Sequence, residues 1–503
     1  MVLLRGSDEA RRRRVPARIW GEIAGSSGSR RWGVRKRALV SDRYQDDPIV
    51  VASRLLACRL RMHDPTVIVM KFGGTSVGGV AAIRQAVEVV RRQLEREPVV
   101  VVSAHAGVTD ALFAIARAAT TGTSDTELIA VRHRHILDGL GLDQHLLDPL
   151  LDELRDLARG VRLVGEATPK VIDAVVSYGE RLSARVVAAA LTAGGMPATA
   201  VDSFDAGMLT DSSFGRARPL PDEGRMLRHL QSVVGVPVLT GFLGADSDGN
   251  ITTLGRNGSD YSAALIGVAL NADEIQIWKD VDGVHTADPR LVKDAQPIRR
   301  MSFADVADLA SFGSNVLHPA AMVPAMQHGI PLRVRNTLSP SAEGTTIEAR
   351  APSDRPEIRA IAHRTGVALV TVHSHRLVSQ HTFLANVFSK LDEIECDVGP
   401  VAVGEAAVTV AIDSAFSERV VERFSVDGEV QVVADCAVVG VIGDAEVLEN
   451  GGIAEVLAEV ATSNTPVRCA GLGAVGSTVA FAVDADRLSE TVQLLHRRFF
   501  TAR

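Results

Sequence analysis

A glycine-rich segment near the start of the ordered pattern could bind a phosphate. Residues 71–77 (KFGGTSV) follow an apolar run and precede a helical pattern. Glycines let the backbone approach a phosphate, exposed N–H groups bind it, and Lys71 adds a positive charge. The segment lacks the GxxxxGK[ST] spacing of a P-loop, so an ordinary glycine-rich turn between a strand and a helix remains the alternative.

Residues 253–261 (TLGRNGSDY) gather glycine, arginine, serine and aspartate at the start of a predicted helix. Arg256 could clamp a carboxylate through two hydrogen bonds, and Asp260 could orient a lysine or a metal-bound phosphate. So many polar residues at one helix N-terminus are hard to explain by structure alone, which favours a ligand site.

Hydroxyl groups follow a second predicted strand. Residues 103–110 (SAHAGVTD) begin where ligands bind in open α/β sheets, at the carboxyl end of a strand. Ser103 and Thr109 could contact a small polar substrate, although Thr109 could equally cap a helix. A lone loop histidine such as His105 is more often incidental than a catalytic base.

Two acidic segments leave a structural and a functional interpretation open. Glu180, in residues 179–183 (GERLS), could favour the dipole of a helix that we expect to begin after it, or could meet a substrate ammonium. Residues 278–290 (WKDVDGVHTADPR) carry acids and cations in a turn-rich loop. These acids could be turn and cap residues, or could line a nucleotide pocket.

The elements that must position these segments alternate between strand and helix. Continuous apolar runs separated by helical patterns predict a mostly parallel sheet covered on both faces. We expect strands at 66–70, 97–103, 198–201, 236–240, 274–278 and 331–335. We expect helices at 79–95, from 109, and at 182–194, 259–270 and 318–328.

The pattern changes after about residue 347. A stretch rich in proline and charge, 351–359, is typical of a linker, and a weak internal repeat follows it. The predicted helices 382–391 and 452–460 are offset by about 70 residues, as are the strands that follow them. Two βαββαβ units are the natural interpretation.

Length and composition exclude several classes of protein. A chain of 503 residues with 46% hydrophobic content predicts about three domains with large cores. Aromatic residues make up only 4%, which argues against a stacking surface for single-stranded nucleic acid, and the net charge of -7 gives no reason to expect a polyanion partner. Four dispersed cysteines make a zinc site or a disulfide framework improbable and favour a cytoplasmic location. No apolar run reaches the roughly 18 residues of a membrane span.

The N-terminal 65 residues differ from the rest in charge. They hold 15 Lys+Arg and 7 Asp+Glu, a balance of +8, so the remaining chain carries -7 - 8 = -15. Little hydrophobic periodicity is present. We interpret residues 1–65 as a basic, disordered extension without a function, or as a start codon assigned too early, with Met62 as the true start.

Together these segments resemble those of the aspartate kinases (aspartokinases), in the amino-acid kinase family. The motifs in order are KFGGTSV, a VVVSAxxGVTD-like loop, GERLSA, TLGRNGSDYSAA, DVDGVHTADPR, FGSNVLHPAA and RNT. The resemblance implies a three-layer αβα sandwich with a mostly parallel central sheet over residues 66–347. It also implies two βαββαβ ACT domains at 360–430 and 431–503.

The resemblance further implies ATP-dependent phosphorylation of the L-aspartate β-carboxylate, with ATP and Mg²⁺ as cofactors and no metal held by protein residues alone. Lys71, with the amides of Gly73 and Gly74, would stabilise charge on the phosphoryl group. Asp260 would hold Lys71 or organise the magnesium environment. A carboxylate nucleophile is already ionised at pH 7, so no general base is required.

The same resemblance implies a pocket for each substrate. Arg256 would clamp the aspartate α-carboxylate and Glu180 would meet the ammonium, with further contacts from Ser103, Thr109 and Ser259. The ATP contacts would be Lys71, Phe72, Gly73, Gly74, Lys279, Asp280, His285, Arg290 and Asn315.

Four positions depart from the commonest pattern of the family. Many relatives have Thr where Lys279 stands, Tyr where His285 stands and Lys where Asn315 stands. Losing the last lysine removes one cation directed at phosphate, for which Lys279 could compensate. Asn257 replaces a usual glycine, but asparagine tolerates the left-handed conformation.

Regulation and assembly follow from the expected ACT domains. The resemblance implies a lysine or threonine effector and a homodimer or larger homo-oligomer. Residues 401–405 (VAVGE) stand where lysine-sensitive relatives usually show a TSE-like run, so the effector pocket could be altered. The rival hypotheses are a kinase of the same fold for another acid, such as glutamate, and a non-catalytic amino-acid sensor.

Overall fold

The computed structural model of the protein describes residues 66–501 except for short gaps at 123–124, 221–225, 227–228, 231, 314–316, 351–356, 375–379, 405, 426–427 and 473–476. The basic extension expected at 1–65 and Asn315 therefore lie outside the described residues.

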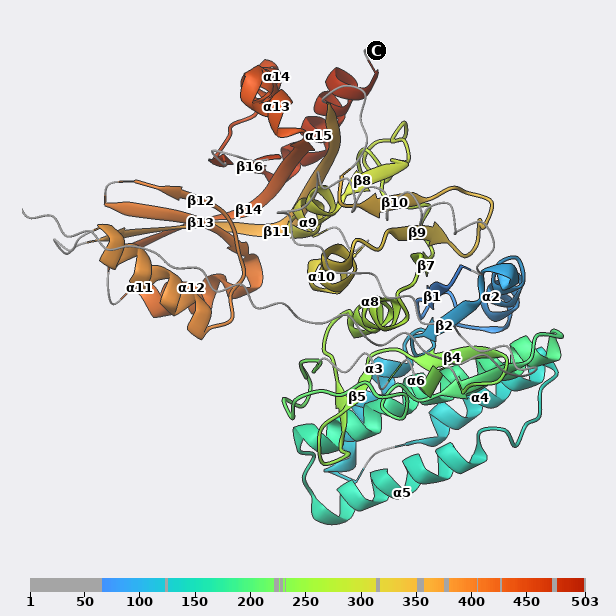
Figure 1. Ribbon diagram of the computed structural model, residues 1–503. Helices are drawn as coiled ribbons and strands as arrows, with labels where there is room; N and C mark the ends of the chain where they lie inside the picture. The colour runs from blue at the N-terminus through green and yellow to red at the C-terminus, as the bar shows by residue number, and fades with distance from the viewer. Residues whose placement is uncertain are drawn as a thin grey trace, which may run out of the picture. The chain divides into compact units, whose positions relative to one another are not determined.

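The N-terminal half is built on an eight-stranded sheet with the order β3-β4-β2-β1-β7-β9-β10-β8 (Figure 1). The six neighbouring strands β3, β4, β2, β1, β7 and β9 are all parallel. In this sheet only the pairing of β9 with β10 is antiparallel. Central strands such as β2 are uninterrupted runs of buried β-branched residues because both faces of the sheet are covered. The strands are β1 Ile68–Phe72, β2 Pro98–Val102, β3 Ala198–Val201, β4 Val236–Thr240, β7 Glu274–Lys279, β8 Arg300–Ser302, β9 Leu332–Asn336 and β10 Thr345–Glu348.

Helices cover both faces of this sheet, which gives the expected three-layer α/β sandwich (Figure 1). Helices α2 to α6 share one apolar core with Ile68, Met70 and Phe72, whereas α8 packs against the opposite face of β1 and β7. A short hairpin, β5 Leu243–Ala245 and β6 Ile251–Thr253, precedes α8. The helices are α2 Val80–Arg91, α3 Val108–Ala119, α4 Glu127–Leu140, α5 Asp148–Val164, α6 Pro169–Ala193, α8 Gly258–Leu270, α9 Phe303–Ser311 and α10 Pro319–His328.

Helix α6 begins earlier than the sequence predicts, so the expectation that Glu180 precedes a helix is wrong. The helix starts at Pro169 after the N-cap Thr168 and runs through Glu180. Gly179, inside this helix, serves close packing: a Cβ there would lie 2.8 Å from the Cβ of Ala104. The glycine lets the middle of α6 approach the loop after β2, where a larger residue would collide.

The C-terminal half is a separate six-stranded antiparallel sheet with the order β12-β13-β11-β14-β16-β15. Its strands are β11 Ile358–Ser374, β12 Val398–Val403, β13 Ala407–Asp413, β14 Gly428–Gly443, β15 Cys469–Leu472 and β16 Thr478–Asp484. The helices of this half are α11 Gln380–Glu393, α12 Ser417–Phe424, α13 Ala445–Val447, α14 Ile453–Thr462 and α15 Leu488–His496. Cys396, Cys436 and Cys469, the described cysteines, are free.

The two C-terminal units share their long strands. The second part of β11, from Val367, pairs with β13 and with the beginning of β14. The first part of β11, before Val367, pairs with the end of β14, which also pairs with β16. Two apolar clusters match these two parts. The strand that completes the second unit thus precedes the first unit in the chain, and the predicted boundary between residues 430 and 431 falls inside β14.

The two halves meet at described contacts. The ring of Phe312, directly after α9, packs on Gly440 of β14, where a Cβ would lie 2.6 Å from the ring. The Thr286 carbonyl accepts a hydrogen bond from Ile361 N at 2.8 Å, and the Thr286 hydroxyl lies 2.9 Å from His496 Nε2. Backbone and side-chain contacts therefore link the loop after β7 to the second C-terminal unit.

Candidate active site

The loops after β1, β2 and β7 converge at one edge of the sheet. Gly73 N donates to Trp278 O at 3.0 Å, and Ala106 N donates to Gly74 O at 3.0 Å. A Cβ at Gly74 would lie 2.9 Å from Ala104 O, so only glycine allows this approach of the first loop to the second. Carboxyl ends of parallel strands are where open α/β sheets bind ligands.

A buried charge cluster lies at this edge. Lys71 Nζ lies 2.6 Å from Asp260 Oδ1, and Lys279 Nζ lies 3.3 Å from Asp260 Oδ2. Burial alone would raise the pKa of Asp260, but the two ammonium groups hold that pKa below its usual range. Burial lowers the pKa of Lys279 although Asp260 opposes it. Two cations and one anion leave a net positive charge facing the glycine-rich loop, which suits an anionic ligand.

The alternation of a strand decides which side chains of the first segment reach this cluster. Successive residues of β1 point to opposite faces, so Lys71 faces α8, where Asp260 lies, and Phe72 faces the other way. Phe72 is fully buried and stacks on Trp278 with ring centroids 6.0 Å apart. The Phe72 side chain therefore belongs to the core. If Phe72 contacts ATP, as the sequence predicted, it must do so through its backbone.

The two glycine amides are not equivalent. The Gly73 N–H is already used in its bond to Trp278 O. Among the described residues, no acceptor is bonded to the N–H groups of Gly74 and Thr75, and Gly73 would carry a Cβ only 3.8 Å from Lys71 Nζ. A phosphate oxygen near Lys71 could thus be bound by the amides after Gly73 rather than by Gly73 itself.

Glu180 reaches the same place from the middle of α6. Its Oε1 accepts a hydrogen bond from Ala104 N at 3.1 Å, and its buried Oε2 has no partner among the described residues. Burial raises the pKa of Glu180 to about 7, while the Ala104 amide and the nearby Lys71 charge oppose that rise. A buried carboxylate oxygen without a donor is a site for a cation such as an ammonium group.

The start of α8 carries the exposed part of the site. Arg256 is exposed, and none of the described residues forms an ion pair with it. Asn257 adopts the left-handed conformation with φ 56, as the sequence predicted for this position. Ser259 lies close to Gly241: a Cβ added at Gly241 would lie 2.9 Å from the Ser259 hydroxyl oxygen.

Sequence reasoning missed two parts of this region. The loop after β4 contacts α8 through Gly241 and through Phe242, whose N–H donates to Ser262 Oγ at 2.9 Å and whose φ is 66. The GFLG run directly after a buried strand was the available signal. A buried chain of hydroxyls was also missed: Thr337 Oγ1 donates to Ser76 Oγ at 2.7 Å, and Ser76 donates to Trp278 O at 3.1 Å. It fixes the first loop against β7 and β9.

The last predicted segment divides between the site and the C-terminal half. Lys279 joins the charge cluster, and Asp280 is exposed beside it. His285 is half-buried, and Arg290 pairs with Asp288 at 2.7 Å, with a guanidinium that is 88% exposed. The following residues, including Val292, join the apolar core of the second C-terminal unit. The pairing with Asp288 uses the Nε and one terminal nitrogen of Arg290, so a nucleotide contact would use its remaining N–H groups.

His105 does not face the site. It is fully buried, its Nδ1 lies 2.5 Å from Val77 O, and its ring lies 5.1 Å from that of His133. Burial, reinforced by the neighbouring histidine, lowers the pKa of His105 to about 3, and burial lowers the pKa of His133 to about 4. His105 is thus a neutral core residue, in agreement with the interpretation that it is no catalytic base.

These two histidines should make the protein sensitive to acid. Unfolded histidines bind protons below pH 6.5, whereas the folded pair stays neutral to about pH 4, so acidification favours the unfolded chain. We expect the free energy of unfolding to fall by roughly 1 kcal/mol per histidine between pH 7 and pH 5.5. Urea unfolding of His133→Gln should show a smaller pH dependence, and exposed His328→Gln should match the wild type. Equal pH dependence in all three proteins would contradict this account.

The described residues show neither a cluster of metal ligands nor a membrane-spanning helix. They contain no group of three or more His, Cys, Asp or Glu side chains placed to hold a metal ion. Within the same part of the chain, no helix is long and apolar enough to cross a membrane.

Comparisons with known proteins agree with this geometry. The amino acid kinase family model matches residues 66–336. The chain is 33% identical to aspartokinase 1, chloroplastic, of Arabidopsis thaliana over 86% of its length and 80% of that protein. It is 32% identical to the lysine-sensitive aspartokinase 3 of Escherichia coli, over 86% of its length and 99% of that protein.

Solved structures give the same result. The crystal structure of E. coli aspartokinase III with aspartate and ADP (R-state) matches with a TM-score of 0.72 at 31% identity, covering 86% of this chain and 100% of that one. The T-state structure of the same enzyme, with lysine and aspartate, matches with a TM-score of 0.74 at 30% identity. The match covers 86% of this chain and 99% of that one.

A parallel sheet with a buried Lys–Asp–Lys cluster at its carboxyl edge, together with the family match, defines an amino acid kinase. Within that class, the identity and coverage above show that the chain belongs to the aspartokinase family.

Proposed function

We propose that this protein transfers the γ-phosphoryl group of ATP to the β-carboxylate of L-aspartate, giving 4-phospho-L-aspartate and ADP. The observation that carries the proposal is the Lys71–Asp260–Lys279 cluster, buried beside free amides of the glycine-rich loop. Buried ammonium groups and free N–H groups in fixed positions stabilise a phosphoryl group whose charge changes during transfer. The product would enter the biosynthesis of lysine, threonine and methionine. The cytoplasmic location expected from the cysteines remains a prediction.

Each side of the transfer has its residues. Lys71 and the amide of Gly74 stabilise charge on the transferring phosphoryl group, and Asp260 keeps the Lys71 ammonium in place. The attacking carboxylate is ionised at neutral pH, so the enzyme needs to orient it rather than to deprotonate it. The neutral, buried state of His105 is consistent with a reaction that needs no base.

The aspartate pocket joins Arg256, from the loop before α8, and Glu180, from the middle of α6. Arg256 binds the α-carboxylate with its exposed guanidinium, and the unpartnered Oε2 of Glu180 binds the ammonium. Hydroxyls of Ser103, Thr109 and Ser259, which are all half-buried, complete the pocket. Two opposite charges at fixed positions select an α-amino acid over a simple dicarboxylate.

Magnesium fits this site as a companion of the nucleotide. Both oxygens of Asp260 lie within ion-pair distance of lysine ammonium groups, which favours a role in holding Lys71 over one as a metal ligand. Mg²⁺ is commonly held by substrate phosphates with one or two carboxylates. The exposed Asp280, next to Lys279, is the carboxylate that could approach it. The ion would neutralise phosphate charge during transfer.

On the nucleotide side, Lys279 supplies a phosphate-directed cation that compensates for the one lost by the departure at Asn315. Its ammonium shares Asp260 with Lys71, so it lies where a phosphate bound near Lys71 would also meet it. His285 and Arg290 remain proposed ATP contacts, although their loop packs against the C-terminal half.

The test is ATP-dependent formation of aspartyl hydroxamate by the purified full-length chain, with glutamate as the competing acid. Activity with aspartate and little with glutamate is expected. Preference for glutamate would support a kinase for another acid. No activity in folded protein would support a non-catalytic sensor, against which the intact Lys71–Asp260 pair argues.

The raised pKa of Glu180 predicts a pH dependence for aspartate. The ionised carboxylate binds the substrate ammonium, and burial keeps it partly protonated up to about pH 7. We expect kcat/KM for aspartate to fall by about tenfold per pH unit below pH 7. Glu180→Gln should have a lower kcat/KM that no longer changes across this range. Parallel profiles in the two proteins, measured from pH 5.5 to 8.5, would rule out Glu180 as the ammonium ligand.

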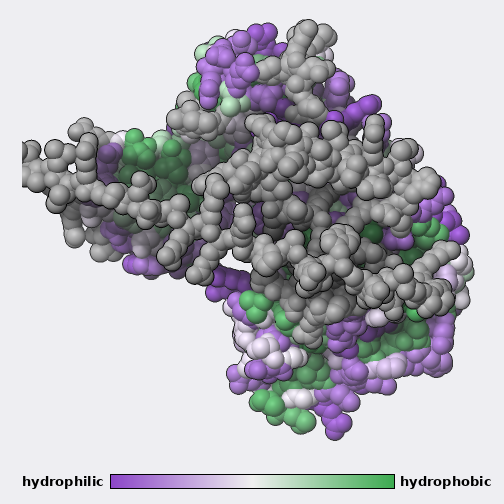
Figure 2. Space-filling view, viewed as in Figure 1, coloured by the Kyte–Doolittle hydropathy of each residue, from purple (hydrophilic) through white to green (hydrophobic). Residues whose placement is uncertain are grey.

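We further propose that the C-terminal units bind an amino-acid effector and join subunits into a homodimer or larger assembly. The edge strand β12 exposes Val398 and Val403, which are 38% and 50% exposed. Figure 2 shows hydrophobic surface gathered in the region of β12 and β13. An apolar sheet edge is a surface that a second copy could cover.

A further inference from the structure

A buried carboxylate of α6 holds the end of the strand that leads to Arg256. Asp173 is 1% exposed and accepts three hydrogen bonds. Its Oδ2 accepts from Gly215 N at 2.8 Å and from Thr253 N at 2.9 Å, and its Oδ1 accepts from Thr253 Oγ1 at 2.8 Å. Thr253 is the last residue of β6, and Arg256 follows as the third residue after it.

No cation balances the charge of Asp173 among the residues that the structure describes. Burial raises its pKa, and only the hydrogen bonds from Gly215 and Thr253 oppose this rise. A buried carboxylate without an ion pair costs stability compared with an apolar side chain of the same shape. Residues of this kind are expected where a protein gives up stability for the geometry of a site.

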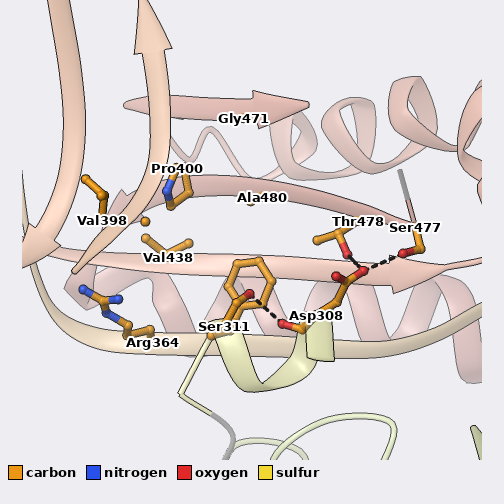
Figure 3. Close-up of a pocket in the computed structure, with 12 residues that line it drawn as sticks. Asp308, Ser311, Arg364, Val398, Pro400, Val438, Gly471, Ser477, Thr478 and Ala480 are labelled. Atoms are coloured by element: carbon orange, nitrogen blue, oxygen red, sulfur yellow. Dashed lines mark hydrogen bonds between the residues drawn. The ribbon is translucent and has the colours of Figure 1, made fainter. Parts of the chain in front are cut away.

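Asp308 of α9 shows a carboxylate in a milder environment. It also accepts hydrogen bonds from hydroxyls, those of Ser477 and Thr478, but it is half-buried and lines a cavity of about 500 Å³ (Figure 3). A polar cavity of this size admits water, which can solvate the charge. Asp173 lacks such access at 1% exposure, so its donors alone must stabilise it.

The Asp173 carboxylate joins two segments that lie side by side. One is the turn around Gly215, whose φ of 83 favours glycine, and the other runs from Thr253 to Arg256. The Thr253 carbonyl accepts from Ala217 N at 2.8 Å, and a Cβ at Gly255 would lie 3.3 Å from Gly215 O. All the polar groups of Thr253 are therefore bonded, and its position is fixed from both sides.

Arg256 depends on this fixed starting point. It lies between two residues in the left-handed conformation, Gly255 with φ 76 and Asn257 with φ 56. The Arg256 side chain is exposed, so packing around it does not set its direction. The direction is set by the backbone of the turn, and the turn leaves β6 at Thr253.

We propose that Asp173 is a positioning residue for aspartate binding, because it fixes the turn that presents Arg256 to the substrate α-carboxylate. The inference rests on the proposed function, in which Arg256 binds that carboxylate. Asp173 bonds to the backbone and to a hydroxyl, not to the guanidinium, so Arg256 keeps its N–H groups for the substrate. A cation held in place before binding loses less conformational entropy when the substrate arrives.

The experiment measures hydroxamate formation by full-length Asp173→Leu and Asp173→Asn. Leucine has a similar shape and accepts no hydrogen bond, so KM for aspartate should rise about tenfold or more while KM for ATP stays within twofold. Asparagine can accept both N–H groups with its carbonyl oxygen and donate its amide to the Thr253 hydroxyl, so its aspartate KM should stay within threefold of the wild type. Asp156→Leu, at an exposed position of α5, is the matched control and should change neither constant.

A double-mutant cycle separates positioning from a general structural role. If Asp173 acts through Arg256, adding Asp173→Leu to Arg256→Ala should raise the aspartate KM by less than twofold further. Thr253→Val removes only the hydroxyl bond to Asp173 and should raise the aspartate KM two- to fivefold, again only when Arg256 is present. Thermal melting establishes that each variant is folded, and Thr253→Val carries the cycle if Asp173→Leu does not fold.

The outcomes distinguish the inference from the function on which it rests. Additive effects in the cycle, equal increases of KM for aspartate and ATP, or equal impairment in Asp173→Asn and Asp173→Leu would overturn the positioning role and leave the kinase proposal intact. An unchanged aspartate KM in Arg256→Ala would remove the clamp and the positioning role together. A wild-type protein without hydroxamate activity would overturn the proposed function and the inference with it.

Discussion

Replacing Lys71 with methionine should lower kcat by about 10²- to 10³-fold, the usual effect of removing one group that stabilises transition-state charge. Lys71 Nζ lies 2.6 Å from Asp260 and beside the glycine-rich loop, so its ammonium is already oriented before substrates bind. Such preorganisation is where electrostatic catalysis gains most. Steady-state kinetics of hydroxamate formation at saturating ATP and aspartate would measure the loss.

The environment of Lys71 makes this variant interpretable. Asp260 keeps Lys279 as a partner after the substitution, so no isolated buried carboxylate is created. Methionine fills much of the space of the lysine stem. Lys170→Met, at an exposed position of α6, is the matched control and should retain full activity. A Lys71→Met enzyme with kcat within threefold of the wild type would remove Lys71 from the catalytic step.

Replacing Arg256 with alanine should raise KM for aspartate by about 10- to 100-fold while kcat changes little. A guanidinium bound to a carboxylate contributes about 1.5–3 kcal/mol, and this contact exists in both the ground state and the transition state. Arg256 is exposed and has no ion-pair partner among the described residues, so its removal should not destabilise the fold. Initial rates over a range of aspartate concentrations at saturating ATP give both constants.

Two comparisons sharpen the Arg256 test. KM for ATP should stay at its wild-type value, because the assigned partner is the amino acid. Arg92→Ala, at an exposed position after α2, should leave all constants unchanged. An unchanged aspartate KM in Arg256→Ala would exclude the clamp, and a large fall in kcat would assign the residue to the phosphoryl group instead.

Burial determined what could be predicted about the fold. The expected strands 198–201 and 236–240 coincide with β3 and β4. A strand buried on both faces is a short uninterrupted apolar run, which describes β4, whereas β3 is a partly exposed strand at the edge of the sheet. Helices α4 and α5 were not predicted, although both are amphipathic. Their polar outer faces mix charged and apolar residues, and exposed Leu128 and Leu163 blur the pattern.

The candidate site was predicted as segments, not as an arrangement. Lys71, Glu180 and Asp260 were each identified from a local run of residues, but no run shows that they come from a strand and two helices to one place. The pairing of Lys279 with Asp260 joins a residue that the sequence assigned to ATP binding with one that it assigned to holding Lys71 or organising magnesium. Contacts over such separations depend on which strands are neighbours, and the β2-β1-β7 order is not written in any single segment.

The sequence alone determined the family, the parallel sheet and the glycine-rich and acidic segments at the ends of its strands, because these depend on local composition and spacing. Only the tertiary structure decided what each residue faces. Gly179 packs the middle of a helix against a loop, Phe72 enters the core because it alternates with Lys71, and β11 completes a unit that follows it in the chain. These outcomes depend on close approach between distant segments, which the order of residues along the chain does not specify.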